Sequence, residues 1–325
     1  MLSESYSQDI NVLPPHFGGR RFYAYSTHFK KLFGARMQKV AINAALSCPN
    51  RDGTKGEGGC TFCINEAFTP SYCTPSKSIA QQIGEGIEFH ERRYRTAGGY
   101  LAYLQPFSNT YAPVAQLEKI YAEALAHPQI KGLIIGTRPD CVDEAKLDLI
   151  ADIAKDHYIS IEYGVESTFD ETLHRINRGH SYAEAERAIA LSAERGLSVG
   201  AHFILGLPGE SVEMLHKTIN RINNLPLTTV KFHQLQIFRG TAMQREYDTH
   251  PERFSFWEAD EYIELFIDLI EELSPKIVVE RFASEAPPRY HHVGAWGLVR
   301  NETLLARFER RLAERNTYQG RRFAQ

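Results

Sequence analysis

Short runs of β-branched and aromatic residues alternate along the chain with segments whose apolar residues recur every three or four positions. The short runs predict strands at residues 39–43, 100–104, 132–136, 159–165, 198–205 and 229–238. Between them, an apolar stripe at Leu117, Ile120, Tyr121, Ala124 and Leu125 predicts one face of a helix. Strands and helices that alternate in this way indicate a parallel sheet with helices outside it.

The ends of two predicted helices carry signals of their own. Pro113 stands where the helix with the apolar stripe begins. Ser181 and Glu184 form a capping box at the start of a second helix, which ends at Gly196. These signals support the helices that the periodicity predicts.

Six β-α units are too few for an eight-stranded barrel, so we expect an α/β fold in which the sheet curls into a partial (β/α)6 TIM-like barrel. Functional residues in such folds lie at the carboxyl ends of the strands. After about residue 245 the pattern changes to a helix at 257–273, a strand-like run at 276–282 and a basic tail. We therefore predict an N-terminal basic extension (1–36), a core barrel (37–245) and a C-terminal α+β extension (246–325).

Composition narrows the class of protein. The chain has 325 residues, of which 43% are hydrophobic and 24% charged, as in globular proteins. Its apolar runs are shorter than the ~18 residues of a membrane span, so no membrane association is expected. The N-terminus has no basic segment followed by an apolar run, which favours a cytoplasmic, reducing location and argues against disulfides.

The net charge is only −3, but both ends of the chain are basic. Residues 10–51 contain seven Lys or Arg and no Asp or Glu. The tail from 306 to 323 carries six arginines: Arg307, Arg310, Arg311, Arg315, Arg321 and Arg322. Such clusters favour a polyanionic partner such as RNA, although solvated surface charge explains them equally well.

Three of the five cysteines, Cys48, Cys60 and Cys63, share one glycine-rich loop after the first predicted strand, with C-x11-C-x2-C spacing. Three thiolates leave one iron of a [4Fe–4S] cluster open to a chelating ligand such as S-adenosylmethionine (SAM). A zinc site with Cys73 as the fourth thiolate is the main alternative. A redox dithiol at Cys60 and Cys63 is less favoured because it needs no third cysteine upstream.

Longer motifs add a family resemblance. The cysteine loop and the β-α series after it resemble the radical SAM superfamily. The segments "GTRPDCV" (136–142), "EYGVESTFDETLHRINRGHSYAEA" (162–185), "HFILGLPGE" (202–210) and "KFHQLQIFRGTAM" (231–243) resemble those that end strands three to six in the catalytic subunit of Elongator. The length of the loop and "LQPFSNTYAP" (104–113) most resemble a bacterial subfamily of radical SAM proteins. The resemblance covers roughly residues 20–285.

The resemblance implies roles for the loop. Cys48, Cys60 and Cys63 would ligate three irons of a [4Fe–4S] cluster, and the amino and carboxylate groups of SAM would chelate the fourth. Phe62, directly before the last cysteine, would pack near the adenine of SAM. Cys73 would have no part in the cluster.

The strand-end motifs imply further contacts with SAM. Glu166 stands where the relatives carry a Gln that meets the polar edge of the cofactor. Arg178 matches the arginine that pairs with the methionine carboxylate. His202 occupies the position of a polar residue that reaches the ribose hydroxyls, and Gly206 would let the backbone approach the adenine closely.

The second and sixth predicted strands contribute further candidates. The sequence "QPFSNT" replaces the stretch that binds the amino group of SAM in many relatives. Asn109 is our candidate for that contact, with Gln105 and Ser108 as alternatives. Lys231 and His233 share one face of the sixth strand, and they line a substrate cavity if that face points into the barrel.

The resemblance implies an enzyme that cleaves SAM reductively to a 5′-deoxyadenosyl radical, with electrons from a flavodoxin- or ferredoxin-type donor. The likeness to Elongator implies tRNA wobble uridine as substrate. Since no separate acetyltransferase domain is visible, we expect a smaller alteration of an existing C5 side chain. The alternatives are radical chemistry on a small metabolite or porphyrin-like molecule and, in another class, a zinc-stabilised RNA-binding protein without catalysis.

Overall fold

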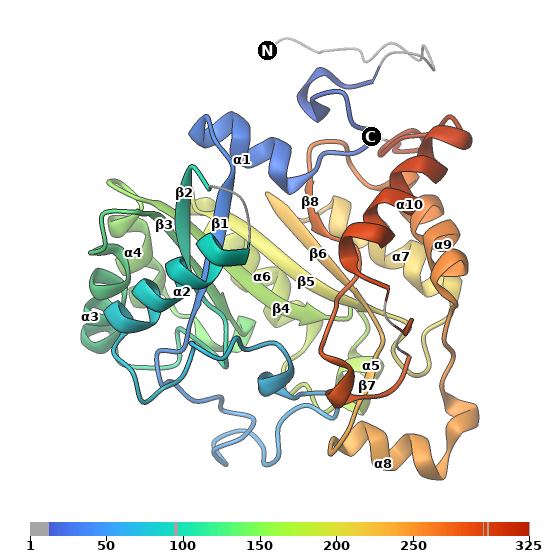
Figure 1. The fold of residues 1–325 in the computed structure, drawn as a ribbon. Helices are drawn as coiled ribbons and strands as arrows, with labels where there is room; N and C mark the ends of the chain where they lie inside the picture. The colour runs from blue at the N-terminus through green and yellow to red at the C-terminus, as the bar shows by residue number, and fades with distance from the viewer. Residues whose placement is uncertain (1–12, 94–96, 295, 298, 325) are drawn as a thin grey trace.

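The computed structural model of the chain describes residues 13–93, 97–294, 296–297 and 299–324. Within these residues a parallel sheet curls into part of a barrel and carries helices on its outer face (Figure 1). The strand order is β1-β2-β3-β4-β5-β6-β8. The strands are β1 (Met37–Ile42), β2 (Gly99–Leu104), β3 (Ile130–Thr137), β4 (Tyr158–Glu166), β5 (Ser198–Leu205), β6 (Thr229–Gln234) and β8 (Val278–Arg281). The predicted α/β partial barrel is confirmed.

The predicted helices form between the strands. The helices are α1 (Tyr25–Phe33), α2 (Ile79–Arg93), α3 (Val114–Leu125), α4 (Glu144–Ile153), α5 (Asp170–Arg175), α6 (Tyr182–Glu194), α7 (Val212–Asn223), α8 (Ala242–Thr249), α9 (Ala259–Glu272) and α10 (Asn301–Glu314). Pro113 is the N-cap of α3, and the buried face of that helix contains Leu117, Tyr121 and Ala124. The capping box of α6 is present with Ser181 and Glu184 as predicted.

The sheet differs from the prediction at β6. The predicted strand 229–238 ends at Gln234, and the amide of Leu235 donates to the carbonyl of Leu205 as the chain leaves the sheet. Residues Ile237–Phe238 form β7, which pairs antiparallel with β9 (His291–Val293) in a separate two-stranded ribbon. Because apolar residues continue through this break, the composition of the segment gives no sign of it.

The strand-like run at 276–282, which the sequence pattern assigns to a C-terminal extension, belongs to the main sheet. It contains β8, which pairs parallel with β6 and becomes the seventh strand of the main sheet. The predicted C-terminal extension therefore contributes to the barrel wall. The domain boundaries at 36 and 245 stay a prediction, and residues 1–12 of the predicted N-terminal extension lie outside the described residues.

The two ends of the sheet are different environments. Figure 1 shows α1 beyond the amino end of β1, and the loop of residues 43–78 beyond its carboxyl end. In the C-terminal part of the chain, α9 packs against α7 and α10, and the ring of Phe308 in α10 stacks on that of Phe282 with 4.7 Å between their centroids. No helix in the described part of the chain is long and apolar enough to cross a bilayer.

Candidate functional site

The loop after β1 presents its thiols from a series of tight turns. The carbonyl of Cys48 accepts from the amide of Arg51 at 2.8 Å, and the carbonyl of Cys60 accepts from the amide of Cys63 at 3.0 Å. Gly59 has φ +82°, and a Cβ there would lie 2.9 Å from Nε of Arg51. Glycine at this position allows both the turn and the close approach of the Arg51 side chain.

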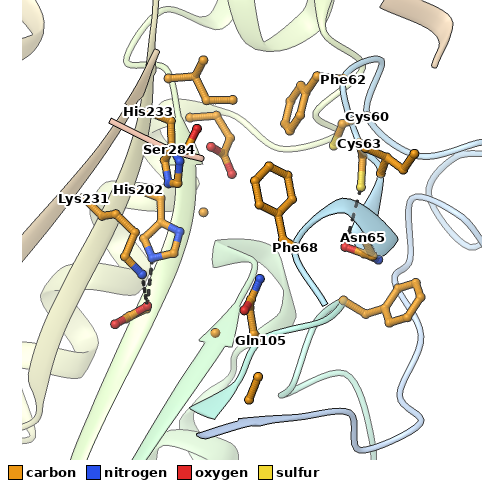
Figure 2. Close-up of a pocket in the computed structure, with 18 of the residues that line it drawn as sticks. Cys60, Phe62, Cys63, Asn65, Phe68, Gln105, His202, Lys231, His233 and Ser284 are labelled. Carbon is orange, nitrogen blue, oxygen red and sulfur yellow. Dashed lines mark hydrogen bonds and ion pairs between the residues drawn. The ribbon is translucent and has the colours of Figure 1, made fainter. Parts of the chain in front are cut away.

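The loop forms one wall of a cavity of about 440 Å³ that is lined by residues from the carboxyl ends of the strands. Figure 2 shows Phe62 beside two of the loop thiols, Lys231 and His202 on the opposite wall, and Phe68 between the two walls. All three cysteines predicted as iron ligands line this cavity. Their role as ligands stays a prediction, but the structure brings them to one site.

The other two cysteines lie elsewhere. Cys73 is 2% exposed within the apolar core, and burial raises the pKa of its thiol to about 12. Burial also raises the pKa of the Cys141 thiol, to about 11. Neither residue is among those that line the cavity. The position of Cys73 in the apolar core, outside the cavity lining, argues against it as a fourth ligand beside the other three cysteines.

Two kinds of metal centre use cysteine thiolates of this kind: a [4Fe–4S] cluster and a zinc ion. In the ranges that the structure describes, no three His, Cys, Asp or Glu side chains converge as they would on a single metal ion. A [4Fe–4S] cluster takes its thiolates at separate irons, so its ligands need not converge on one point. Three separate thiols on one cavity wall thus fit a cluster, and they do not fit a zinc site that includes Cys73.

Two buried N–H donors approach the sulfur of Cys60. Nη1 of Arg178 lies 3.3 Å and Nδ2 of Asn50 lies 3.7 Å from that Sγ. Nη2 of Arg178 donates to the carbonyl of Gly164 at 2.5 Å, and Arg138 donates to the carbonyl of Arg178 at 2.8 Å. Burial lowers the pKa of the Arg178 guanidinium, but the negative groups around it, Cys60, Glu166 and Asp140, together outweigh burial and raise that pKa. The guanidinium is therefore a fixed positive charge beside a thiol of the loop.

Glu166 ends β4 beside this arginine. Its backbone has φ +72°, an unusual conformation for a residue other than glycine, and its carboxylate lies 3.7 Å from Nη2 of Arg178. The side chain lines the cavity, as does Phe62. Positive φ at a polar residue is typical of functional loops and turns the carboxylate into the cavity.

A buried ion network forms the floor of the cavity. The carboxylate of Glu162 in β4 accepts from Lys39 of β1 at 2.8 Å and from Lys231 of β6 at 2.9 Å. Glu280 of β8 lies 2.8 Å from both amines. Burial alone would raise the pKa of Glu162, but the Lys231 and Lys39 ammonium groups outweigh it and hold that pKa well below its usual range. The floor contains two ammonium groups and two carboxylates in contact, so their charges balance.

Two histidines stand above this floor. Nε2 of His202 lies 2.9 Å from Glu162, and the ring centroids of His202 and His233 are 5.9 Å apart. Burial and then the Lys231 charge lower the pKa of His202, and burial and then the Arg281 charge lower that of His233 well below its usual value. Both imidazoles are thus neutral at pH 7. The sequence left open which way Lys231 and His233 face, and in the structure both side chains line the cavity.

Two predicted SAM contacts lie away from the cavity lining. The amide nitrogen of Asn109 donates to the carbonyls of Leu104, Pro106 and Gly136, and the side chain is fully buried. Gly206 has φ +87°, and a Cβ there would lie 2.6 Å from the ring of Trp257. This geometry does not support a SAM contact for Asn109. At Gly206, the absence of a side chain is explained by the close approach of the Trp257 ring. Gln105, the alternative to Asn109, does line the cavity.

Lys39 and Arg51 of the N-terminal basic cluster line the cavity, but most of the other basic residues predicted from the sequence lie away from it. Arg311 and Arg315 contact carboxylates of α9, and Arg307 and Arg322 are paired in the same way. Lys30 and Lys31 are exposed on α1, at the amino ends of the strands (Figure 1). The clusters that suggested a polyanionic partner are therefore largely paired or on the opposite end of the barrel.

The fold and the site together define a barrel enzyme whose cavity wall carries three thiols. The Radical SAM superfamily model matches residues 50–222, and the Radical_SAM C-terminal domain model matches residues 227–313. The chain belongs to the radical SAM superfamily. Enzymes of this superfamily use a [4Fe–4S] cluster and SAM, and both are cofactors of this enzyme.

Relatives and solved structures agree with this assignment. The protein YhcC of Escherichia coli is 36% identical over 255 residues, which cover 78% of this chain and 80% of YhcC. YtqA of Bacillus subtilis is 30% identical over 313 residues, 96% of each chain. The structure of Elp3 from Methanocaldococcus infernus aligns with a TM-score of 0.66 at 17% identity. That alignment covers 87% of this chain and 64% of Elp3, so about a third of Elp3 has no counterpart here.

A shorter match concerns a protein with a stated reaction. The tRNA uridine(34) acetyltransferase of Methanocaldococcus infernus is 32% identical over 114 residues. The match covers 34% of this chain and 21% of the acetyltransferase. It therefore relates one segment of the chain, and not the whole enzyme.

Proposed function

We propose that this radical SAM enzyme alters an existing C5 side chain on the wobble uridine of tRNA. The observation that carries the proposal is the cavity, in which a wall of thiols faces a wall of polar side chains across a space of about 440 Å³. Because the cluster and SAM would occupy part of this space, the cavity can admit only a small molecule or one unpaired nucleotide, and not a duplex. The segment shared with a tRNA uridine(34) acetyltransferase supports uridine as the nucleotide.

In this proposal Cys48, Cys60 and Cys63 hold the cluster, and an external flavodoxin- or ferredoxin-type protein supplies the electron. When bound, the cluster and SAM together provide the radical that takes hydrogen from an unactivated C–H bond. Arg178 offsets the negative charge on the Cys60 side of the cavity through its contact at 3.3 Å. The same guanidinium carries a buried Nε–H that has no partner in the described residues, which leaves a donor for a carboxylate of SAM.

Two other residues predicted to contact SAM, Phe62 and His202, line the walls of the cavity. Phe62 offers a ring to the adenine beside the thiols. His202 is held by Glu162 and is neutral, so its other ring nitrogen is available to a ribose hydroxyl. Phe68, between the two walls, restricts the access of water to the reacting atoms.

The test compares modified nucleosides in tRNA from a strain without the gene, its parent, and the strain complemented with Cys60→Ala. We expect the deletion and the Cys60→Ala strain to lack the same C5-modified uridine and to accumulate its precursor, because both lack the cluster. Mass spectrometry of digested tRNA measures both nucleosides. Identical profiles in all three strains would overturn the tRNA substrate and favour a small-molecule one.

A further inference from the structure

Four arginines around the mouth of the cavity form no salt bridge to a carboxylate in the described residues: Arg51, Arg239, Arg281 and Arg289. All four are exposed. Arg51 donates to the carbonyl of Cys63, Arg239 donates to that of His291, and Arg289 contacts the hydroxyl of Tyr290. The contacts of Arg239 and Arg289 with a carbonyl and a hydroxyl leave their guanidinium charges available to a ligand, whereas Arg51 also interacts with the Cys63 thiol and with Glu66.

These residues, which we call the mouth arginines, come from segments far apart in the sequence. Arg51 and Arg281 line the cavity, from the cysteine loop and from β8. Arg239 directly follows Phe238, another residue of the lining. Arg289 lies 4.8 Å from the ring centroid of Tyr290. The ring belongs to an apolar cluster with Phe68 and Phe238, both of which line the cavity, so Arg239 and Arg289 lie next to the cavity lining in the chain and in the cluster.

The β7–β9 ribbon holds two of the mouth arginines in place. Phe238 of β7 is paired with His291 of β9, and the amide of Arg239 donates to the carbonyl of Tyr290 at 2.8 Å. The nearby carboxylates in the sequence have other partners, since Glu246 pairs with Arg175, Asp248 with His292 and Glu285 with Arg300. The ribbon thus carries guanidinium groups without carboxylate partners, while the neighbouring carboxylates are paired with other residues.

We propose that the mouth arginines bind backbone phosphates of single-stranded RNA on either side of the nucleotide that enters the cavity. The inference rests on the proposed function and adds the surface that holds the substrate. A nucleotide can enter such a cavity only when it is unpaired, and its flanking phosphates then stay outside, at the mouth. Guanidinium groups suit phosphate because they donate two parallel hydrogen bonds.

The test measures binding of unfractionated tRNA to the anaerobically purified holoenzyme by fluorescence anisotropy over a series of KCl concentrations. One variant combines Arg239→Gln, Arg281→Gln and Arg289→Gln. The matched control combines Lys30→Gln, Lys31→Gln and Arg36→Gln. These three residues are exposed at the amino ends of the strands, so the control loses the same charge away from the mouth. Arg51 is left unchanged because its contact with Cys63 belongs to the cysteine loop.

We expect the slope of log Kobs against log[KCl] to become less negative by about 2 in the mouth variant, since each phosphate contact on a single strand contributes about 0.7. The control should keep the wild-type slope. Substitution of the same three mouth residues by Lys should restore most of the slope, because lysine keeps the charge. Cluster absorbance and the thermal midpoint establish that each variant is folded and loaded.

The outcomes separate this inference from the proposed function. If the wild-type enzyme binds tRNA and the mouth variant keeps its slope, or if the control loses as much as the mouth variant, the mouth arginines are not the phosphate site and the tRNA substrate stands. If the wild-type enzyme shows no salt-dependent binding of tRNA, the proposed function fails and this inference fails with it. An acidic peptide that binds in place of tRNA would also overturn the inference.

Discussion

Arginines have opposite surroundings in two regions of this enzyme. On the outer face of α9 and α10, Arg315 lies 3.0 Å from Glu264 and 2.7 Å from Asp268, and its neighbours are paired in similar ways. At the mouth of the cavity, Arg281 and Arg289 have no carboxylate partner within the described ranges. The tail is the richer region in arginine, but its charges are balanced by those of α9. What a charged residue can bind depends on the partners that the fold supplies.

The same contrast applies to the thiols. Those of Cys48, Cys60 and Cys63 open into the cavity, whereas that of Cys73 is enclosed by apolar side chains of the core. At the floor of the cavity, by contrast, carboxylates and amines are buried together as partners. Substitution in each region should therefore affect a different property: cofactor binding, stability or RNA binding.

The largest expected effect separates the two kinds of cysteine. Cys60→Ala should lose essentially all cluster and all reductive cleavage of SAM, because two thiolates do not hold the cluster with one open iron. Cys73→Ala should keep both, with a modest loss of stability from the small cavity that it leaves. Iron and acid-labile sulfide per chain, and the methionine released from SAM, measure the outcome.

The same measurement tests the zinc alternative. Loss of the cluster in Cys73→Ala would show that this thiol is a ligand. Protein purified without oxygen that contained about one zinc and no sulfide would exclude the cluster altogether. The corresponding variants of Cys48 and Cys63 should behave like Cys60→Ala.

The second effect concerns the buried charges of the floor. Glu162→Gln removes the carboxylate that Lys39 and Lys231 share and leaves Glu280 to balance both amines. Removing one partner of a buried ion pair costs about 3–5 kcal/mol, and here two buried ammonium groups would share one carboxylate, so one positive charge is left uncompensated. Urea unfolding of the holoenzyme should show a lower midpoint.

A double variant provides the control for the floor. Adding Lys231→Met to Glu162→Gln removes one amine together with the carboxylate, so the double variant should regain part of the lost stability. Two results would show that the floor is not one coupled network. One is a loss of unfolding free energy below about 1 kcal/mol in Glu162→Gln. The other is a double variant that is less stable than Glu162→Gln by as much as Lys231→Met alone destabilises the wild-type enzyme.

Much of the fold could be predicted because burial is periodic in the sequence. The stripe at Leu117, Tyr121 and Ala124 predicts α3, and the capping box predicts the start of α6. The place of β8 beside β6 could not be predicted in this way, because pairing between strands is a property of two distant segments. The end of β6 at Gln234 was missed because apolar residues continue through it.

The site was predictable to a similar extent. A loop with three cysteines is a local signal, and the structure brings all of them to one cavity. The floor was missed, although Glu162 and Lys231 each stand as a charge within an otherwise apolar strand. Such a charge indicates that a partner exists, but the sequence does not say which residue it is. The mouth arginines were missed because counts of charge take no account of pairing.

The smallest expected effect compares one arginine from each region. Arg315→Gln should lower the free energy of unfolding by about 1 kcal/mol, since it removes a partly exposed group that contacts Glu264 and Asp268. Arg281→Gln should change it by less than about 0.5 kcal/mol, because no ion pair is lost. For tRNA binding, the order of the two effects reverses, and Arg281→Gln has the larger one. Arg281→Gln should make the salt slope less negative by about 0.7, and Arg315→Gln should leave it unchanged. If both variants changed the same property, pairing would not be what distinguishes the two regions.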